Sequence, residues 1–398
     1  MLVVVGCALV WLSLANATSL VLGKKNPALA TRFGLPSAET KGVLALSIAT
    51  DSPTPRQIGE ARQLARAALR REPLNATAAV ALGMIATVEN QTDLARQLME
   101  YSERVSRRNP FAQLWMIEDH VSRGDVAGAL VHYDRAMRVS VNLRGTLIPI
   151  LLQASADPAI AKSLATTLSN RPNWWPDALG AIIYQGSAPA VTLPIVLRQL
   201  KLQPGNSQER TFLGAAMRRL ADGGAFSQAA GLYREARGNQ RANGNLVRDG
   251  GFDTDSFLPP FEWDLHGEAG LTATVQPREG AEGRSLFLSV NQGRQGELAR
   301  QLLLLKPGHY RFAALAGDIR GDAFERPQIK LFCATAEARV TLDVRLNAAD
   351  QGGAWTRSDF DVPASSCPAQ WLVIASAAPE QGGQGDPWID EVAIKPLG

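Results

Sequence analysis

Residues Ala129-Leu130-Val131-His132-Tyr133-Asp134-Arg135-Ala136 carry a small residue at each end and an aromatic residue between them. Counting back from Ala129 in steps of 34 residues reaches Ala95 and then Ala61. A period of this length is typical of a unit of two antiparallel helices that stacks on its neighbours, with small residues where the helices approach closely. The sequence therefore predicts a helical solenoid in the first half of the chain.

The spacing Ala-x3-Tyr-x2-Ala returns at Ala229 to Ala236, and together with the period it resembles the tetratricopeptide repeat (TPR). Apolar residues at helical spacing continue over residues 41–238, so we expect a TPR-like helical domain there. The frame predicts further anchors at Ser163 and Leu197, which indicates that the middle repeats are degenerate. We expect Asn109-Pro110 to close a helix. Since a solenoid of this kind has no catalytic centre of its own, the resemblance implies a protein partner that docks on it.

The amino-acid composition limits the number of domains and the kinds of partner that the chain can have. The chain has 398 residues, of which 45% are hydrophobic, which is enough material for two or three globular domains. Lys and Arg number 41 against 38 Asp and Glu, for a net charge of +3. This balance is too even for an electrostatic nucleic-acid binder, so we expect no nucleic-acid partner.

The first residues form an apolar segment. Residues 2–23 carry no charge and end at Lys24-Lys25, and Ala15-Asn16-Ala17 has the small-x-small pattern of a signal-peptidase site. Residues 1–23 are therefore predicted to be either a signal peptide or a membrane anchor, and residues 24–40 a linker. Because the positive charges follow the apolar segment, the positive-inside rule would leave the body of an anchored protein in the cytoplasm.

Two cysteines are relevant to the cellular compartment in which the protein resides. Cys333 and Cys367 both lie in the last third of the chain, where they could form a structural disulfide or stay as two buried thiols. A disulfide requires an oxidising compartment. We predict the bond, and with it a cell-envelope location: periplasmic, anchored to the inner membrane, or secreted.

The pattern changes after a polar hinge at 239–244. Short alternating runs separated by Gly and Pro turns are typical of strands in an antiparallel sandwich, predicted over 245–398. The predicted strands are Ser285–Val290, Tyr310–Leu315, Gln328–Phe332, Val340–Leu346 and Gln370–Ala375. The predicted fold class is thus a multidomain α plus β chain, an all-α solenoid followed by a β-sandwich.

The string Asn245-Leu246-Val247-Arg248-Asp249-Gly250-Gly251-Phe252-Asp253 resembles the opening strand of galactose-binding-like jelly rolls, the class that includes many carbohydrate-binding modules. Lys306-Pro307-Gly308-His309-Tyr310 resembles their Pro-Gly-x-Tyr hairpin, and Trp388-Ile389-Asp390-Glu391-Val392 resembles their closing strand. The resemblance covers about residues 245–398. It implies a jelly roll with a possible polysaccharide ligand, since the same fold also serves proteins that bind no sugar.

Sugar-binding faces use aromatic planes, and four tryptophans fall in this half. Trp263 is the first choice for an exposed glycan-binding plane because polar residues surround it, with His266 beside it; Trp355 is the second choice. Arg320 could bind hydroxyl groups. Trp371 and Trp388 lie inside apolar strands, which favours the core for both.

The opening and closing strands of a jelly roll lie close together, so Asp253 and Asp390 could converge on a structural calcium, or they could be turn acids with no metal. The sequence contains no catalytic motif, so we predict no catalytic residues, no other cofactor and a non-enzymatic interaction protein. The domain pairing favours exopolysaccharide assembly or export. A pure protein scaffold and a carbohydrate-active hydrolase or lyase are the alternatives.

Overall fold

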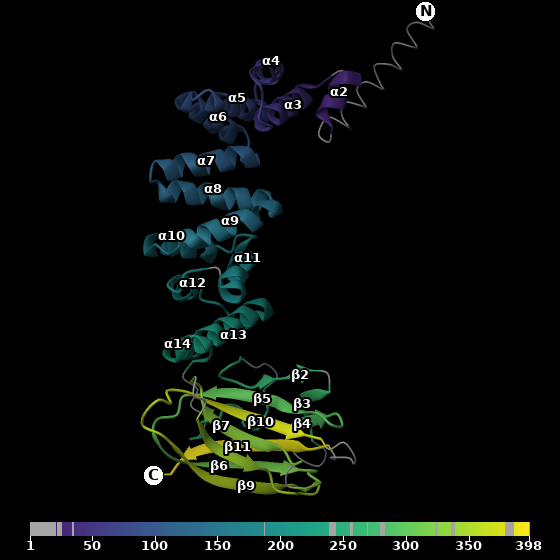
Figure 1. The fold of residues 1–398 in the computed structure, drawn as a ribbon, viewed down its shortest axis with the longest axis vertical. Helices are drawn as coiled ribbons and strands as arrows, with labels where there is room; N and C mark the ends of the chain where they lie inside the picture. The colour runs from purple at the N-terminus through teal and green to yellow at the C-terminus, as the bar shows by residue number, and fades with distance from the viewer. Residues whose placement is uncertain are drawn as a thin grey trace, which may run out of the picture. The chain divides into compact units, whose positions relative to one another are not determined.

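The computed structural model describes residues 21, 26–33, 36–186, 188–238, 244–254, 258–268, 270–278, 283–322, 325–335, 339–378 and 386–397 (Figure 1). The predicted signal peptide or anchor at 1–23, apart from Val21, lies outside these residues, as do Lys24-Lys25 and hinge residues 239–243. No helix in the described ranges is long and apolar enough to span a bilayer. The chain forms two compact units, Met1–Leu200 and Lys201–Gly398.

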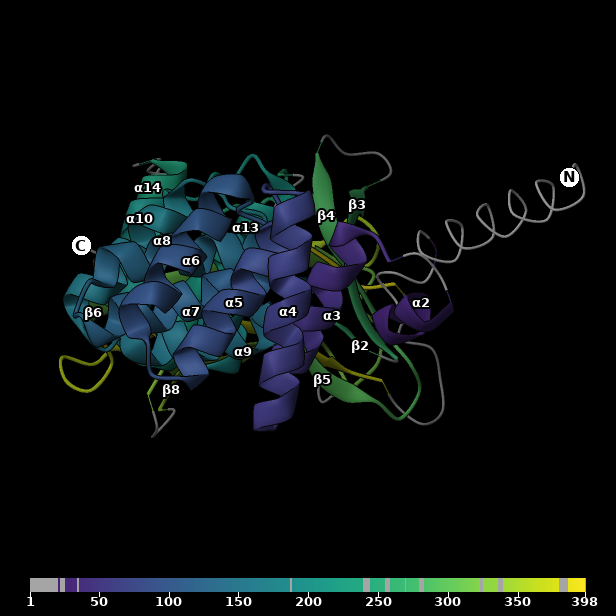
Figure 2. The same cartoon turned by 90° about the horizontal axis from the view of Figure 1, so that it is seen from above.

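The described residues of the first unit form helices and no strand. Successive helices pack in pairs, α3 on α4, α5 on α6 and α7 on α8; α3 and α4 lie side by side in Figure 2. The helices are α2 (Pro27–Phe33), α3 (Ala38–Thr50), α4 (Pro55–Arg71), α5 (Ala76–Val88), α6 (Thr92–Val105), α7 (Pro110–Ser122), α8 (Val126–Val139), α9 (Val141–Ala154), α10 (Pro158–Ser169), α11 (Trp175–Gly180), the π-helix η1 (Ala181–Gln185) and α12 (Thr192–Leu200).

The residues spaced 34 apart from Ala61 onward lie on every second helix. Ala61, Ala95 and Ala129 lie in α4, α6 and α8, and all three are buried, which is where a helical repeat needs small side chains. Ser163 and Leu197 lie at the corresponding places in α10 and α12. The structure therefore has the helical repeat that the period predicts.

Helix starts are set by side-chain caps. Thr54 and Gln57 form a capping box at α4, and Asn75 caps α5. Asn109 caps α7 and Pro110 is its first residue, so the prediction that Asn109-Pro110 closes a helix is wrong. Proline suits the first helical position because the N–H that it lacks has no partner there.

Where the structure describes the second unit, it holds two helices and two sheets. The helices are α13 (Ser207–Asp222) and α14 (Phe226–Arg237). The strands are β1 (Asp264–Leu265), β2 (Gly267–Glu268), β3 (Leu271–Pro277), β4 (Arg284–Val290), β5 (Gln295–Leu303), β6 (Gly308–Gly317), β7 (Gln328–Cys333), β8 (Val340–Arg345), β9 (Ala354–Val362), β10 (Gln370–Ala377) and β11 (Trp388–Pro396).

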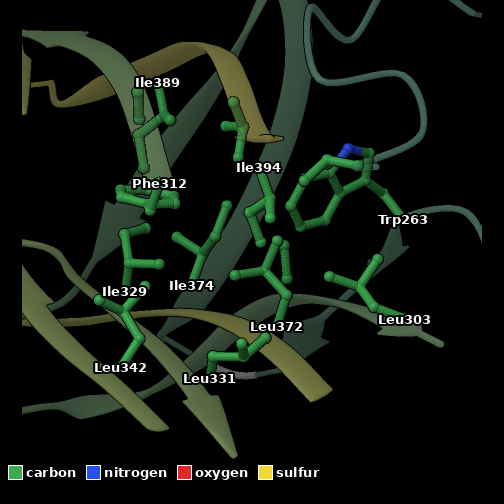
Figure 3. Packing of buried hydrophobic residues seen from close by; sticks show 14 of the residues in the cluster. Trp263, Leu303, Phe312, Ile329, Leu331, Leu342, Leu372, Ile374, Ile389 and Ile394 are labelled. Carbon is green, nitrogen blue, oxygen red and sulfur yellow. The ribbon is translucent and has the colours of Figure 1, made fainter. Parts of the chain in front are cut away.

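All strand pairs between these elements are antiparallel. The five-stranded sheet has the order β1-β5-β10-β7-β8, and the six-stranded sheet has the order β2-β3-β4-β11-β6-β9. Their facing sides share one hydrophobic core, shown in Figure 3, which includes Phe312, Leu331, Leu372 and Ile394. The predicted fold class, helical solenoid followed by antiparallel sandwich, is confirmed.

The opening string is fastened to the closing strand β11. The side-chain amide of Asn245 donates to the carbonyl of Val392 at 3.0 Å, and its Oδ1 accepts from the N–H of Ile394 at 3.1 Å. The N–H of Val392 donates to the carbonyl of Gly250 at 2.9 Å. The two ends of the sandwich sequence thus close one edge of the core together.

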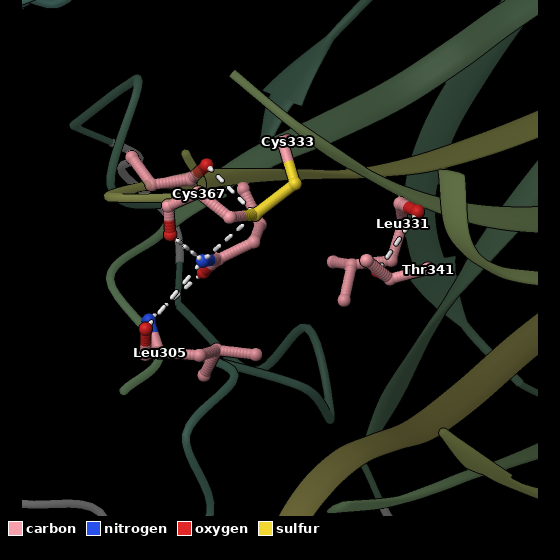
Figure 4. Close-up of a disulfide and its surroundings, with 7 residues drawn as sticks. Leu305, Leu331, Cys333, Thr341 and Cys367 are labelled. Atoms are coloured by element: carbon pink, nitrogen blue, oxygen red, sulfur yellow. Dashed lines mark hydrogen bonds between the residues drawn. A yellow bond between two sulfur atoms is a disulfide. The ribbon is translucent and has the colours of Figure 1, made fainter. Parts of the chain in front are cut away.

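The disulfide between Cys333 and Cys367 is present, with the two Cα atoms 5.0 Å apart (Figure 4). Both cysteines are buried in the core of the sandwich. The side-chain amide of Gln370 donates to the carbonyl of Cys367 at 2.8 Å, while its Oε1 accepts from the N–H of Leu305 at 2.9 Å. The bond therefore joins the end of β7 to the loop before β10, and Gln370 links this loop to Leu305.

Candidate functional site

Trp263 is not on the surface. Its side chain is 1% exposed, stacks on Phe252 with ring centroids 5.1 Å apart, and lies in the core of Figure 3. The indole N–H donates to the carbonyl of Asp249 at 2.9 Å, which satisfies its one polar group. The prediction of an exposed glycan-binding plane at Trp263 is therefore wrong.

The polar neighbours of Trp263 are covered by partners from distant parts of the chain. Glu262 is buried and accepts from the Tyr233 hydroxyl at 2.7 Å and from both ends of the Arg237 guanidinium at 2.9 Å. Asp264 pairs with Arg218 of α13 at 2.9 Å. These charged groups lie in contacts within the second unit, which is why they do not mark an exposed surface.

Trp355 and Arg320 lie away from that region. Trp355 is 42% exposed on β9, the edge strand of the six-stranded sheet, with the Arg357 guanidinium 5.2 Å from its ring centre. Arg320 is exposed in the loop after β6 and pairs with Asp318 at 3.1 Å. Trp263, Trp355, His266 and Arg320 do not converge on one site.

A groove lies instead on the outer face of the five-stranded sheet. Leu372 and Ile374 of β10 point into the core, so the alternation of the strand places Trp371, Val373 and Ala375 on the opposite side. The groove has a volume of about 520 Å³, within the usual range for small-ligand sites. Its lining residues are Gln295, Gly296, Glu297, Gln328, Lys330, Phe332, Arg345, Val373, Ala375, Ser376 and Ala377.

Two aromatic rings stand on this face. Phe332 of β7 lines the groove and is half-buried, and Trp371 is directly opposite it across the β7–β10 pair. Residues directly opposite in an antiparallel pair share a face, so the rings are neighbours at one end of the groove. The Arg300 guanidinium lies 4.7 Å from the centre of the Trp371 ring, whereas no cation of the described part of the chain is placed over the Phe332 ring, which lines the groove.

Polar groups of both charges border these rings. Lys330 and Arg345 come from β7 and β8, and Glu297 comes from β5. Burial raises the pKa of the Glu297 carboxyl, and its Oε1 is buried with no hydrogen-bond partner among the described residues. The Arg300 guanidinium lies 3.5 Å from this oxygen and the His266 imidazole 3.7 Å from it, without a hydrogen bond to either.

His266 is the one predicted glycan-contact residue that borders this region. It lines a second hollow of about 410 Å³, and both hollows are lined by Gln295, Gly296 and Glu297 of β5. The sequence signal that could have located the groove is the alternation of core-facing and outward-facing residues along β10 and β7. Trp371 and Phe332 fall on the residues of their strands that alternate with Leu372, Leu331 and the other core positions.

Asp253 and Asp390 do approach each other. A Cβ added at Gly251 would lie 3.1 Å from Asp253 Oδ2 and 3.8 Å from Asp390 Oδ1. Asp390 is buried, and burial raises the pKa of its carboxyl although the N–H of Glu391 donates to it at 2.7 Å. The Arg278 guanidinium lies 3.7 Å from the other carboxylate oxygen. A calcium ion could share these carboxylates only if backbone carbonyls or water completed its shell, because no described cluster contains three His, Cys, Asp or Glu residues.

No protein-family profile matches the chain, and no curated protein matches its sequence. Solved structures match the sandwich. One, described as "CBM4 structure and function", is 15% identical and covers 38% of this chain and 99% of its own, with a TM-score of 0.29. A family 16 carbohydrate-binding module is 16% identical and covers 38% of this chain and 99% of its own, with a TM-score of 0.28.

A xylan-binding domain from Paenibacillus barcinonensis is 12% identical and covers 39% of this chain and 97% of its own, with a TM-score of 0.29. With identities and TM-scores this low, what those domains bind carries no argument about the ligand of this chain.

Proposed function

We propose that this chain is a non-enzymatic interaction protein of the cell envelope, whose sandwich binds glycan in the groove on the five-stranded sheet. The observation that carries the proposal is the combination of the Phe332 ring with amide and charged side chains in one open groove. A pyranose ring presents C–H groups on its faces and hydroxyls around its edge. An aromatic plane therefore suits the faces, while Gln295, Gln328 and Lys330 supply hydrogen bonds for the edge.

Phe332→Ala is expected to weaken binding of the full chain to a polysaccharide that it retains by roughly tenfold or more, which corresponds to about 1.4 kcal/mol. The reason is that the variant loses the ring that would stack on the sugar, while the half-buried position limits the cost to the fold. Affinity electrophoresis through gels that contain the polysaccharide measures the change, with circular dichroism as the check on folding.

Trp355→Ala is the matched control, because it removes an exposed aromatic ring from the edge of the other sheet. It should leave retention unchanged. If Trp355→Ala abolishes retention while Phe332→Ala does not, the glycan site lies on β9 and not in the groove.

A structural calcium at Asp253 and Asp390 is a second proposal, supported by the approach of a buried carboxylate to an exposed one. Calcium at a hundred times its dissociation constant should stabilise the sandwich by about 2.7 kcal/mol, and a chelator should reverse the gain. Urea denaturation with calcium or chelator measures this. Asp390→Asn should remove the response, whereas Asp359→Asn on the exposed face of β9 should keep it; equal responses from both variants would contradict the site.

The Cys333–Cys367 bond supports an oxidising location, and with it export to the cell envelope. We further propose that the TPR-like helical unit docks a protein partner and that the setting is exopolysaccharide assembly or export. A pure scaffold should show no retention on any polysaccharide. A hydrolase or lyase should release new chain ends from the polysaccharide that retains the protein, which a reducing-end assay detects.

A further inference from the structure

Four arginines of α4 are exposed, and together they form what we call the basic face of this helix. They are Arg56, Arg66, Arg70 and Arg71. None of their guanidinium groups makes a hydrogen bond or an ion pair with a residue that the structure describes, whereas Arg62 of the same helix pairs with Glu89. The only acidic residue in α4 is Glu60. The exposed side of the helix therefore carries a surplus of positive charge.

The helical repeat shows which residues of other helices correspond to the basic face. Steps of 34 residues from the three buried alanines of α4 reach residues that are also buried in α6 and α8. The three sets are Ala61, Ala65 and Ala68 in α4, Ala95, Met99 and Ser102 in α6, and Ala129, Tyr133 and Ala136 in α8. Because the buried sides agree, the outward sides of the three helices can be compared residue by residue.

Arg66 stands where both of the other helices carry an acid. The corresponding residues are Glu100 in α6 and Asp134 in α8, and each precedes an arginine by four residues. Asp134 pairs with that arginine, Arg138, at 2.7 Å. In α4 the residue four positions after Arg66 is Arg70, so two like charges replace a favourable pair. Like charges at this spacing destabilise a helix, which is a cost that an anionic partner would reverse.

The partner has to be extended. Arg56 and Arg70 belong to one straight element and are about 21 Å apart along its axis, at about 1.5 Å per residue. A single phosphate or carboxylate cannot reach both, whereas an anionic surface contacts the whole face. Arginine suits phosphodiester groups, because its planar fork donates to two oxygens at once.

We propose that the basic face of α4 lies against the anionic headgroups of a phospholipid membrane. The uncharged segment at 2–23, which the sequence predicts to be a signal peptide or a membrane anchor, precedes α4 in the same unit. As an anchor it brings a membrane to α4 through the chain itself, which favours lipid over an acidic protein. The helix packs on α3 and α5 with its other side, so the contact leaves the solenoid intact.

The test measures how fast phenylglyoxal modifies each arginine of the full chain, by mass spectrometry, on vesicles of phosphatidylcholine and on vesicles that also contain phosphatidylglycerol. We expect the anionic vesicles to slow the modification of Arg66 and Arg70 by about fivefold or more, and salt to reduce this protection. Arg138, exposed on α8, is the internal control and should react equally on both. The comparison does not depend on whether residues 2–23 insert, since both vesicles have the same hydrocarbon core.

Arg66→Glu restores the acid that α6 and α8 carry. It should unfold at the same urea concentration as the parent or at a slightly higher one, because Arg70 gains a partner. Protection of the remaining arginines of the basic face should nevertheless fall by about fivefold or more. Lys162→Glu is the matched control, since it makes the same change in net charge at an exposed residue of α10 and should keep the protection.

Equal modification rates on the two kinds of vesicle would overturn the proposal, as would protection of Arg138 to the same degree as Arg70. Equal losses in the two glutamate variants would indicate attraction by net charge alone and overturn the assignment to α4. If soluble polyglutamate with the same number of anionic groups protects the basic face as well as the vesicles do, the face binds acidic polymers and the membrane is the wrong partner.

Discussion

Trp263→Ala is expected to destabilise the sandwich by roughly 3–5 kcal/mol, the usual cost of truncating a fully buried large aromatic residue. The variant loses the stack on Phe252, leaves a cavity in the shared core and removes the donor to the Asp249 carbonyl. Since native domains are stable by only about 5–15 kcal/mol, much of the sandwich population could unfold. Hydrogen exchange of peptides from β5 and β10 across a urea series measures the loss in this unit directly.

Trp355→Ala is the matched comparison, since it removes the same side chain from an exposed position. Its effect on stability should stay within about 0.5 kcal/mol. Equal losses of stability in the two variants would show that Trp263 is not the core residue described above.

Gly250→Ala should also destabilise the sandwich strongly. A Cβ at Gly250 would lie 1.9 Å from the carbonyl oxygen of Val392, and because this oxygen belongs to the backbone and the Cβ is bonded directly to Cα, no rotation of a side chain can relieve the clash. Overpacking of this kind costs about 1–3 kcal/mol and can cost more when the backbone must shift. Here the shift would also break the hydrogen bond from the Val392 N–H to the Gly250 carbonyl. Urea denaturation followed by exchange in β11 measures the effect.

Gly267→Ala provides the control, because a Cβ at that exposed residue would meet no atom within 4 Å. Its sandwich should unfold at the same urea concentration as that of the parent chain. If Gly250→Ala does so too, the opening string is not held against β11 as described.

The sequence predicted the positions of helices and strands better than it predicted which side chains are buried. The 34-residue period placed the second helix of each repeat, and the five predicted strands correspond to β4, β6, β7, β8 and β10. The error at Trp263 has a physical cause. Its polar neighbours indicated solvent, but Glu262 and Asp264 are neutralised by Arg237 and Arg218, and nothing local in the sequence signals such distant partners.

The groove was missed for a related reason. Strand β10 is apolar on both faces, because one face meets the core and the other carries Trp371, Val373 and Ala375. Alternation alone cannot tell which of two apolar faces is open. The pairing of β10 with β5 and β7, which brings charged and amide side chains beside that face, is a property of the sheet and not of any one strand.

The hydrogen bonds and the ion pair between Glu262 and α14 determine where the chain can be truncated. A fragment that begins at Asn245 would keep both sheets and the disulfide. It would lack Tyr233 and Arg237, so the carboxylate of Glu262 would lose its hydrogen-bond and ion-pair partners. Removing one partner of a buried ion pair commonly costs about 3–5 kcal/mol. A fragment that begins at Lys201 keeps these partners in α14 and also Arg218 of α13, the partner of Asp264, so a fragment that carries the groove should begin before the last two helices and not at the first strand.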